Sequence, residues 1–99
     1  MKLITKELKK QIPGLYSTEN IDVSEKIAYI KYFHPLSSWN WYAVEFDGED
    51  LFFGFVDGDY PEWGYFSLSE LQSINIRGLG IERDLYFDEK TLSEVRRKI

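Results

Sequence analysis

Apolar residues alternate with polar or small residues through the middle of the chain, in runs that are separated by Asp-Gly pairs. The runs cover residues 39–46, 51–56 and, more briefly, 65–66. Asp47-Gly48 and Asp57-Gly58 favour tight reversals between neighbouring strands, because Gly and Asp tolerate the positive φ angles of hairpin turns. The pattern therefore predicts an antiparallel meander at the centre of the chain.

The N-terminal third predicts a helix, a loop and one further strand. Residues 2–12 place apolar side chains at helical spacing opposite lysines, and Pro13-Gly14 follows as a stop signal. Residues 17–25 are polar and predict a loop. Residues 27–34 are rich in β-branched and aromatic side chains and predict a strand that Pro35 ends, with both of its faces at least partly covered.

Two capping signals organise the C-terminal part. Ser67 with Glu70 matches the capping-box spacing and predicts a short middle helix, and Thr91 with Glu94 repeats it before a terminal helix over residues 91–99. Residues 85–87 predict an edge strand. We therefore expect an α+β fold, in which an antiparallel three- to five-stranded meander sheet is flanked by an N-terminal, a short middle and a C-terminal helix.

Composition limits the class of protein. The 99 residues predict a single domain over 1–99, and 43% hydrophobic residues are enough for a cooperative core. The absence of cysteine excludes disulfides and thiolate sites, and it fits a reducing compartment. The first ten residues lack the apolar region of a signal peptide, and no apolar run is long enough to cross a bilayer. We therefore expect a soluble, cytoplasmic protein that contacts no membrane.

Charge is distributed unevenly along the chain. The net charge is -5, which is the wrong sign for a surface that neutralises phosphates throughout. Basic residues gather near both termini, whereas no Lys or Arg occurs in residues 35–76. The same stretch holds seven acidic residues between Glu45 and Glu62, and residues 39–71 hold eleven of the seventeen aromatic residues.

The aromatic residues predict a binding surface. Large rings occupy both faces of the central strands, and one or two short helices are expected to cover only one face. Part of this apolar surface should therefore be exposed or covered by a partner, although an aromatic-rich core explains the rings equally well. Tyr and Trp beside acidic turns suit a protein-binding hot spot. The candidate binding residues are Trp39, Trp41, Asp47, Glu49, Asp50, Asp57, Asp59, Tyr60, Glu62 and Trp63.

The carboxylates allow two chemical hypotheses, each with a structural alternative. The two acidic turns could converge on a hard cation, but their spacing does not match a calcium loop, and ordinary turn chemistry is favoured. Glu45 shares the predicted face of Trp41 and Ala43, so it could be a desolvated acid, but pairing with Lys31 on the neighbouring strand is favoured. His34 is the single histidine and supports no nucleophilic triad. We assign no catalytic residue, no metal ligand and no cofactor.

Six stretches that span most of the chain occur together: LYSTE at 15–19, KYFHP at 31–35, WNWY at 39–42, FDGEDLFFG at 46–54, GYFSLSEL at 64–71 and IERDLYF at 81–87. In this combination the chain resembles an uncharacterised bacterial family, domain-of-unknown-function family 2958, whose members are common on plasmids, phages and integrated elements. It departs from the family pattern at Trp63, where leucine is usual, and before Ile81, where a proline is expected. The resemblance implies an accessory protein of a mobile element and transfers no catalytic residue.

We favour a small non-enzymatic interaction protein that binds a macromolecular partner, most simply a protein, through the acidic, aromatic end of its sheet. One version of this hypothesis is mimicry of nucleic-acid charge. The pattern leaves a homodimer open. One alternative is a metal-assisted or carboxylate-dependent hydrolase that uses some of Glu45, Asp47, Asp50, Asp57 and Asp59. The other is nucleic-acid binding, which the overall charge disfavours, through the basic termini, namely Lys6, Lys9, Lys10, Arg96, Arg97 and Lys98.

Overall fold

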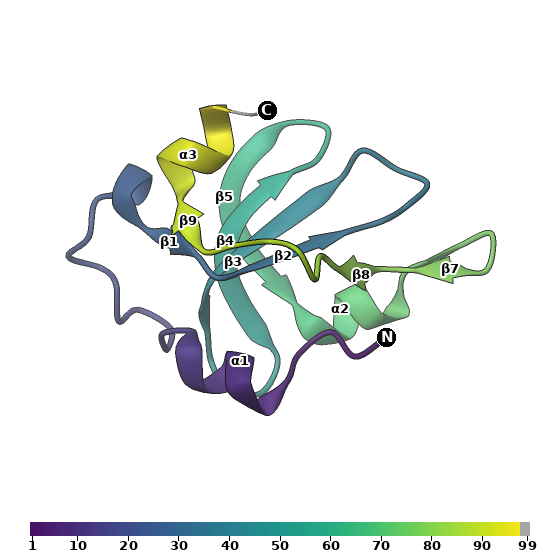
Figure 1. Ribbon diagram of the computed structural model, residues 1–99, viewed down its shortest axis with the longest axis horizontal. Coiled ribbons are helices and arrows are strands. Elements are labelled where there is room, and N and C mark those ends of the chain that lie inside the picture. The colour runs from purple at the N-terminus through teal and green to yellow at the C-terminus, as the bar shows by residue number, and fades with distance from the viewer. Residues whose placement is uncertain (98–99) are drawn as a thin grey trace.

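A five-stranded antiparallel sheet forms the centre of the molecule (Figure 1). The computed structural model describes residues 1–97 and confirms the α+β class. The sheet order is β5-β4-β3-β2-β8, so four consecutive strands form the predicted meander and β8 pairs with β2 at the far edge. The strands are β2 Ile30–Phe33, β3 Asn40–Phe46, β4 Leu51–Asp57, β5 Pro61–Ser67 and β8 Glu82–Arg83.

Three short α-helices and one 3₁₀ helix lie around the sheet within residues 1–97, and two of the α-helices begin where the sequence predicts. Ser67 Oγ accepts a hydrogen bond from the Glu70 N–H at 3.0 Å and donates to the Glu70 carboxylate at 2.9 Å, so the predicted pair caps α2. Thr91 and Glu94 form the complete capping box, in which the Thr91 N–H donates to the Glu94 carboxylate and the Glu94 N–H donates to the Thr91 hydroxyl oxygen, both at 3.3 Å. Within residues 1–97, no helix has the length and apolar character needed to span a membrane. The helices are α1 Lys6–Gln11, the 3₁₀ helix η1 Val23–Glu25, α2 Leu68–Ser73 and α3 Leu92–Arg97.

Two small ladders complete the fold. β1 Ile27–Ala28 pairs with β9 Lys90–Thr91, next to the main sheet. β6 Asn75–Ile76 and β7 Leu79–Gly80 form a hairpin that the sequence analysis did not predict. Its turn residues have φ angles of 53° at Arg77 and 84° at Gly78, the left-handed pair typical of a type I′ turn. The sequence did not indicate this turn, because its first position holds Arg rather than the Asn or Asp that is usual there.

Several predicted boundaries are wrong at the edges of elements. The N-terminal helix begins only after Thr5, whose side chain accepts from the Leu8 N–H and caps it, so Leu3 and Ile4 are buried as non-helical chain. The predicted strand over 27–34 is divided into β1 and β2, which pair with different partners. Lys98 and Ile99, the end of the predicted terminal helix, lie outside the described residues.

The two predicted edge elements also differ from the structure. β5 extends over seven residues rather than two, because Pro61 can occupy an edge strand whose outer N–H needs no partner. The predicted edge strand at 85–87 is wrong: this segment is a turn, and Tyr86 is 93% exposed. The edge is formed instead by β8, two residues earlier in the chain.

Both faces of the sheet are covered, which corrects the expectation that short helices can cover only one. On one face, residues before and after α1 pack with α2 against the sheet, and the Tyr32 hydroxyl donates to the Leu3 carbonyl at 2.7 Å. On the other face, Leu92 and Val95 of α3 cover Tyr42, Val44 and Phe55. Six of the eleven aromatic residues in 39–71 are therefore buried.

Candidate functional site

The two acidic turns lie at opposite ends of β4 (Figure 1). Asp47 to Asp50 precede the strand, and Asp57 is the last of its seven residues, which begin at Leu51. A strand of this length separates its ends by roughly 20 Å. The turns therefore do not converge. Within residues 1–97, no three His, Asp or Glu side chains are grouped so that they could hold a metal ion.

The carboxylates of the first turn are occupied by backbone donors. Asp47 Oδ1 accepts hydrogen bonds from the N–H groups of Glu49 and Asp50 at 2.8 Å and of Leu51 at 3.0 Å. These bonds hold the pKa of Asp47 below its ordinary value, with the Asp50 N–H as the largest cause. The Asp50 carboxylate accepts from the Ser69 N–H and hydroxyl at 2.8 and 3.1 Å, which links this turn to α2. The first turn is structural.

Gly58 in the second turn makes room for a tryptophan. A Cβ on Gly58 would lie 2.6 Å from the Trp39 ring, so only glycine admits the ring in this position. The left-handed φ expected of both hairpin glycines occurs at Gly48, with φ of 91°, but not at Gly58. The Asp57-Gly58 pair thus places Trp39 against the turn between β4 and β5.

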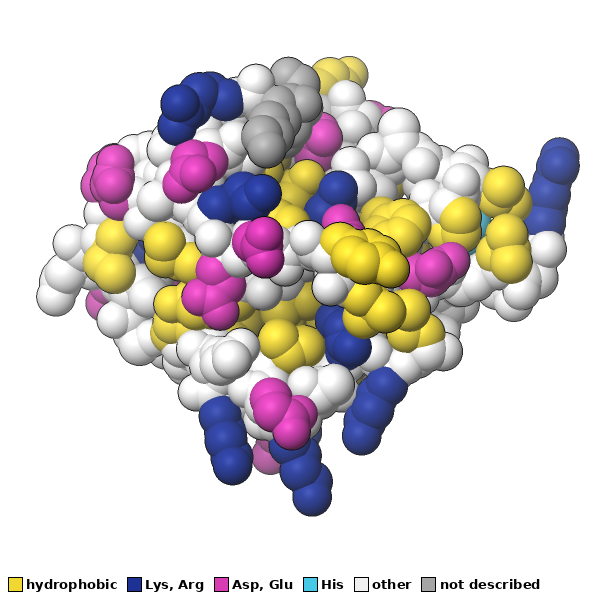
Figure 2. All heavy atoms as spheres, viewed as in Figure 1, with side chains coloured by type: hydrophobic (Ala, Val, Ile, Leu, Met, Phe, Trp, Pro, Cys, Tyr) yellow, Lys and Arg dark blue, Asp and Glu magenta, His cyan; other side chains and the backbone are white. Residues whose placement is uncertain are grey.

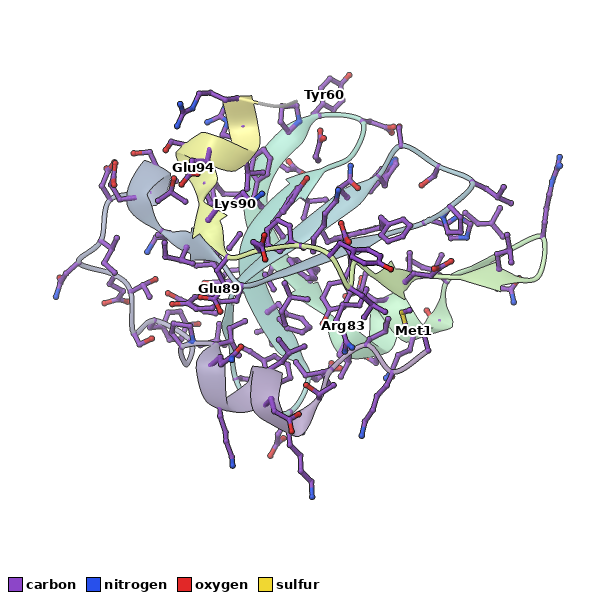
Figure 3. All side chains as sticks on the ribbon, viewed as in Figure 1. Met1, Tyr60, Arg83, Glu89, Lys90 and Glu94 are labelled. Atoms are coloured by element: carbon purple, nitrogen blue, oxygen red, sulfur yellow. The ribbon has the colours of Figure 1, made fainter. Side chains whose placement is uncertain are left out.

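An aromatic and acidic surface forms at this end of the sheet. We call it the sheet-end surface. Tyr60 is 79% exposed and points away from the molecule (Figure 3), and Trp39 is 36% exposed. The pairing of Asp57 with Asn40 and Pro61 aligns the ends of three strands here. We define this surface by the six candidate residues at this end of the sheet. Asp57 and Trp63 are on the face that α3 covers, Trp39 and Glu62 are on the opposite face, and Asp59 and Tyr60 lie in the turn between β4 and β5.

Burial limits the role of Trp63, and the four remaining candidate binding residues lie outside the sheet-end surface. Trp41 is buried in the core, with its ring centroid 5.7 Å from that of Trp39, so it supports the surface rather than forming it. Trp63 is half-buried against Phe55, with ring centroids 5.4 Å apart. Glu49 is exposed at the opposite turn together with Asp47. Six of the ten candidate residues thus lie at this end of the sheet, on its two faces and in the turn, and four lie elsewhere.

An apolar groove of about 250 Å³ continues from Trp39 toward the β6–β7 hairpin. His34 forms part of its wall: Nδ1 accepts from the Leu36 N–H at 3.0 Å, so Nε2 carries the proton and donates to the Leu79 carbonyl at 2.8 Å. Both imidazole nitrogens therefore have structural roles. The groove is lined by His34, Ser37, Trp39, Trp41, Ile74, Ile76 and Ile81.

Glu45 does not pair with Lys31, and it does not share a face with Trp41. The register shifts between Ala43 and Glu45, which is a β-bulge that moves the Glu45 side chain to the opposite face. Lys31 lies 3.8 Å from the Asp84 carboxylate instead. A bulge changes the alternation by one residue, so the face of Glu45 could not be derived from the spacing alone.

The Glu45 carboxylate is buried in a hydrogen-bond network that the sequence analysis missed. Oε1 accepts from the Tyr16 N–H at 2.8 Å, and Oε2 accepts from the Thr18 N–H at 3.2 Å and from the Thr18 hydroxyl. Lys26 Nζ donates to the same Thr18 hydroxyl at 2.7 Å and to the Thr18 carbonyl. Thr18 thus connects a buried ammonium to a buried carboxylate and fixes the loop before η1.

A cavity of about 370 Å³ lies where the segment between β8 and β9 faces the sheet. Its lining includes Lys31, Lys90, Asp57 and Asp84, and the Lys31 ammonium lies 6.0 Å from the Tyr42 ring centroid. Two ammonium and two carboxylate groups balance one another. The cavity therefore offers no net charge with which to select an ionic ligand.

The basic residues near the two termini do not form one patch among the described residues. α1, with Lys6, Lys9 and Lys10, lies at the opposite edge of the molecule from α3 (Figure 1), and basic side chains extend from both edges (Figure 2). Arg96 on α3 lies 5.6 Å from the Phe55 ring centroid. Lys98, the remaining predicted member, lies outside the described residues.

Comparison with protein families gives one match. The model of a family described as "Protein of unknown function (DUF2958)" matches residues 3–97, which agrees with the resemblance of the six stretches. Searches of curated proteins and of solved structures found no match. The description of the family transfers no residue role, so the site rests on the geometry of this chain.

Proposed function

The chain belongs to the DUF2958 family, whose description assigns no activity, and from its surface we propose that it is a non-enzymatic interaction protein for a basic polypeptide partner. The observation that carries the proposal is the sheet-end surface. Exposed Trp39 and Tyr60 lie there beside Asp57, Asp59 and Glu62, in a stretch of 42 residues, 35–76, that contains no Lys or Arg.

The physical basis is the combination of rigid rings with one sign of charge. Trp and Tyr bury large areas at low cost in side-chain entropy and dominate many binding hot spots. Carboxylates around such anchors steer and orient a basic partner. The apolar groove beside Trp39 offers space for a hydrophobic side chain of that partner. The proposal therefore requires a segment that carries both apolar and basic residues.

A role as an accessory protein of a mobile element belongs to the same proposal, on the strength of the family resemblance. Mimicry of nucleic-acid charge is less well supported. Such mimicry needs a row of closely spaced carboxylates, and the predicted acidic residues are divided between two ends of β4. Asp47 and Asp50 also bind the backbone of their own turn and α2. A polypeptide partner is therefore favoured over competition with DNA or RNA.

A displayed library of random twelve-residue peptides, selected on the immobilised protein, tests the proposal. We expect selected peptides to combine Lys or Arg with aromatic or aliphatic residues. Their affinity, measured by fluorescence anisotropy, should fall about tenfold or more when Asp57→Asn, Asp59→Asn and Glu62→Gln are combined, or with Trp39→Ala alone. Loss of charge steering should also make binding less sensitive to salt.

A matched triple variant controls for net charge. Glu25→Gln, Glu49→Gln and Asp88→Asn remove three exposed carboxylates that lie outside the sheet-end surface. This variant should bind the selected peptides with unchanged affinity. The proposal is wrong if the library gives no binding peptide, or if the two triple variants weaken binding equally.

A further inference from the structure

β5 is a long edge strand. Its seven residues pair with β4 on one side, and within residues 1–97 no strand pairs with its other side. The opposite edge of the sheet, β8, has only two residues. A free edge presents unpaired N–H and C=O groups that can accept a further strand.

The hydrogen-bond phase identifies which residues face outward. In an antiparallel ladder, alternate residues direct their backbone groups to the same neighbour. The Leu68 N–H donates to the Asp50 carbonyl at 2.8 Å, directly beyond the Leu51–Ser67 pair. Counting in steps of two places the backbone groups of Glu62, Gly64 and Phe66 toward β4. Those of Trp63 and Tyr65 therefore point to the outer edge.

The hairpin between β3 and β4 confirms this phase independently. The Asp47 N–H donates to the Leu51 carbonyl at 2.9 Å, so Leu51 and the alternate residues after it direct their backbone groups to β3. Phe52 and Gly54 then face β5, opposite Phe66 and Gly64. The hydrogen bonds on both sides of β4, to β3 and to β5, thus give the same assignment.

Few features protect this edge. Natural edge strands are commonly blocked by Lys, Pro or a bulge. In β5, Pro61 and Glu62 occupy one end, and the centre of the strand is aromatic and uncharged. On one face, Tyr65 is 52% exposed, and the Phe53 ring centroid lies 5.2 Å from that of Tyr65 and 6.3 Å from that of Trp63. An added strand could place alternate apolar side chains beside this row.

The charges near the two ends of β5 indicate which kind of strand can pair with its free edge. Asp59 and Glu62 lie at one end of β5, and Asp50 and Glu70 lie near its other end. A second copy, paired antiparallel about Gly64, would bring the acidic residues of one end against those of the other. An extended segment with Lys or Arg near both of its ends meets carboxylates at both. The charge pattern therefore favours a basic segment over self-association.

We infer that β5 binds an extended, basic polypeptide segment by strand addition. This inference rests on the proposed function, because it gives the binding mode of the same partner, which would continue from the sheet-end surface along the edge. The bound segment spans about seven residues, with apolar side chains at alternate central positions and basic residues toward its ends. Backbone bonds to Trp63 and Tyr65 supply affinity, and the aromatic row supplies side-chain selectivity.

Backbone methylation of the peptides selected above tests the mode without altering the protein. An N-methyl group removes one donor at a time, and a strand uses only alternate N–H groups for one neighbour. We expect affinity to fall about tenfold at every second position and to change little at the positions between. Apolar residues in the selected sequences should recur with a period of two.

A pair of variants tests the edge from the side of the protein. Tyr65→Pro removes the outward N–H and leaves the ladder with β4 intact, whereas Tyr65→Ala removes the ring and keeps the N–H. We expect Tyr65→Pro to bind about tenfold more weakly than Tyr65→Ala. If Tyr65→Pro fails to fold, the N-methyl scan still decides between the modes.

The outcomes distinguish this inference from the proposed function. The selected peptides can depend on Asp57, Asp59 and Glu62 and yet show helical spacing of their apolar residues and no alternation in the methyl scan. That result overturns strand addition and leaves the proposed function standing. A library without binding peptides overturns both. Analytical ultracentrifugation tests for self-association. A dimer that is lost in Tyr65→Pro and retained in Tyr65→Ala assigns the edge to a second copy and overturns the inference that β5 binds a basic segment.

Discussion

The indole of Trp39 lies in the space that a side chain on Gly58 would need, with Cζ3 2.6 Å from the position of a Cβ there. This relationship ties the start of β3 to the turn between β4 and β5. It holds a partly exposed tryptophan over the turn that carries Asp57 and Asp59. The position of Trp39 in the sheet-end surface thus depends on glycine at position 58.

Gly58→Ala should therefore displace the Trp39 ring. We expect a loss of about 1 kcal/mol in the free energy of unfolding, at the low end for overpacking because the ring can move toward solvent. The indole N–H resonance of Trp39 should shift in an NMR spectrum of the labelled protein, and peptide binding should weaken. Gly64→Ala is the control, since nothing lies within 4 Å of its Cβ position. An unchanged Trp39 resonance in Gly58→Ala would contradict the packing argument.

Local signals explain why the central fold could be predicted. Asp47-Gly48 and the two helix caps at Ser67 and Thr91 act over three or four residues, so their chemistry is readable in the sequence. β5 was predicted too short because the strand signal was interrupted by Pro61, which an edge position tolerates. Coverage of the second face by α3 could not be predicted, because it depends on where the chain returns after β8.

Thr18→Val should destabilise the protein through the buried network. The substitution keeps the shape of the side chain but removes the hydroxyl that donates to Glu45 and accepts from Lys26. Both charged groups then lose one hydrogen bond in a site where water has little access. We expect the free energy of unfolding, measured with urea, to fall by about 2 to 3 kcal/mol.

Two variants calibrate this result. Thr18→Ser keeps the hydroxyl and should recover most of the lost stability. Lys31→Met removes the cation that the sequence had assigned to Glu45, and it should cost at most about 1 kcal/mol, because its 3.8 Å contact with Asp84 is partly exposed. A larger loss with Lys31→Met than with Thr18→Val would contradict the assignment of Glu45 to the Thr18 network.

The candidate site was predictable only in part, and for a physical reason. Composition identified the aromatic and acidic residues as candidates. Strand register decides which of them lie close together, and it places Asp47 and Asp57 at opposite ends of β4. Glu45 was assigned to the wrong face because one bulge reverses the alternation. Its partner Thr18 is 27 residues away in the chain, and Lys26, which it reaches through Thr18, is 19 residues away, beyond any local signal.

Asp47 should make stability depend on pH in the acidic range. Three backbone N–H donors lower the pKa of Asp47 below its ordinary value of 3.8, so the folded state favours the ionised carboxylate. Its contribution is therefore fully present above that value and is lost as the pH falls through the lower pKa of the folded state. We expect the wild type to be more stable than Asp47→Asn near neutral pH, and the difference to shrink below about pH 4.

Urea unfolding at a series of pH values measures this difference. Glu49→Gln is the control, because it removes one charge from the same turn, where only the backbone N–H of Glu49 contacts Asp47. A difference between wild type and Asp47→Asn that stays constant from neutral to acidic pH would contradict the role of the backbone donors.

Divalent cations should leave thermal stability unchanged. A cation that binds only the folded state raises its stability by mass action, by about 2.7 kcal/mol when its concentration is a hundred times the dissociation constant. Within residues 1–97, no group of three acidic or histidine side chains is placed to provide such binding, and the two acidic turns lie at opposite ends of β4. Melting temperatures with calcium, magnesium or manganese should therefore equal those with a chelator. A rise that disappears in the Asp57→Asn and Asp59→Asn variant would contradict this prediction and restore the metal-assisted hydrolase as the leading hypothesis for the second turn.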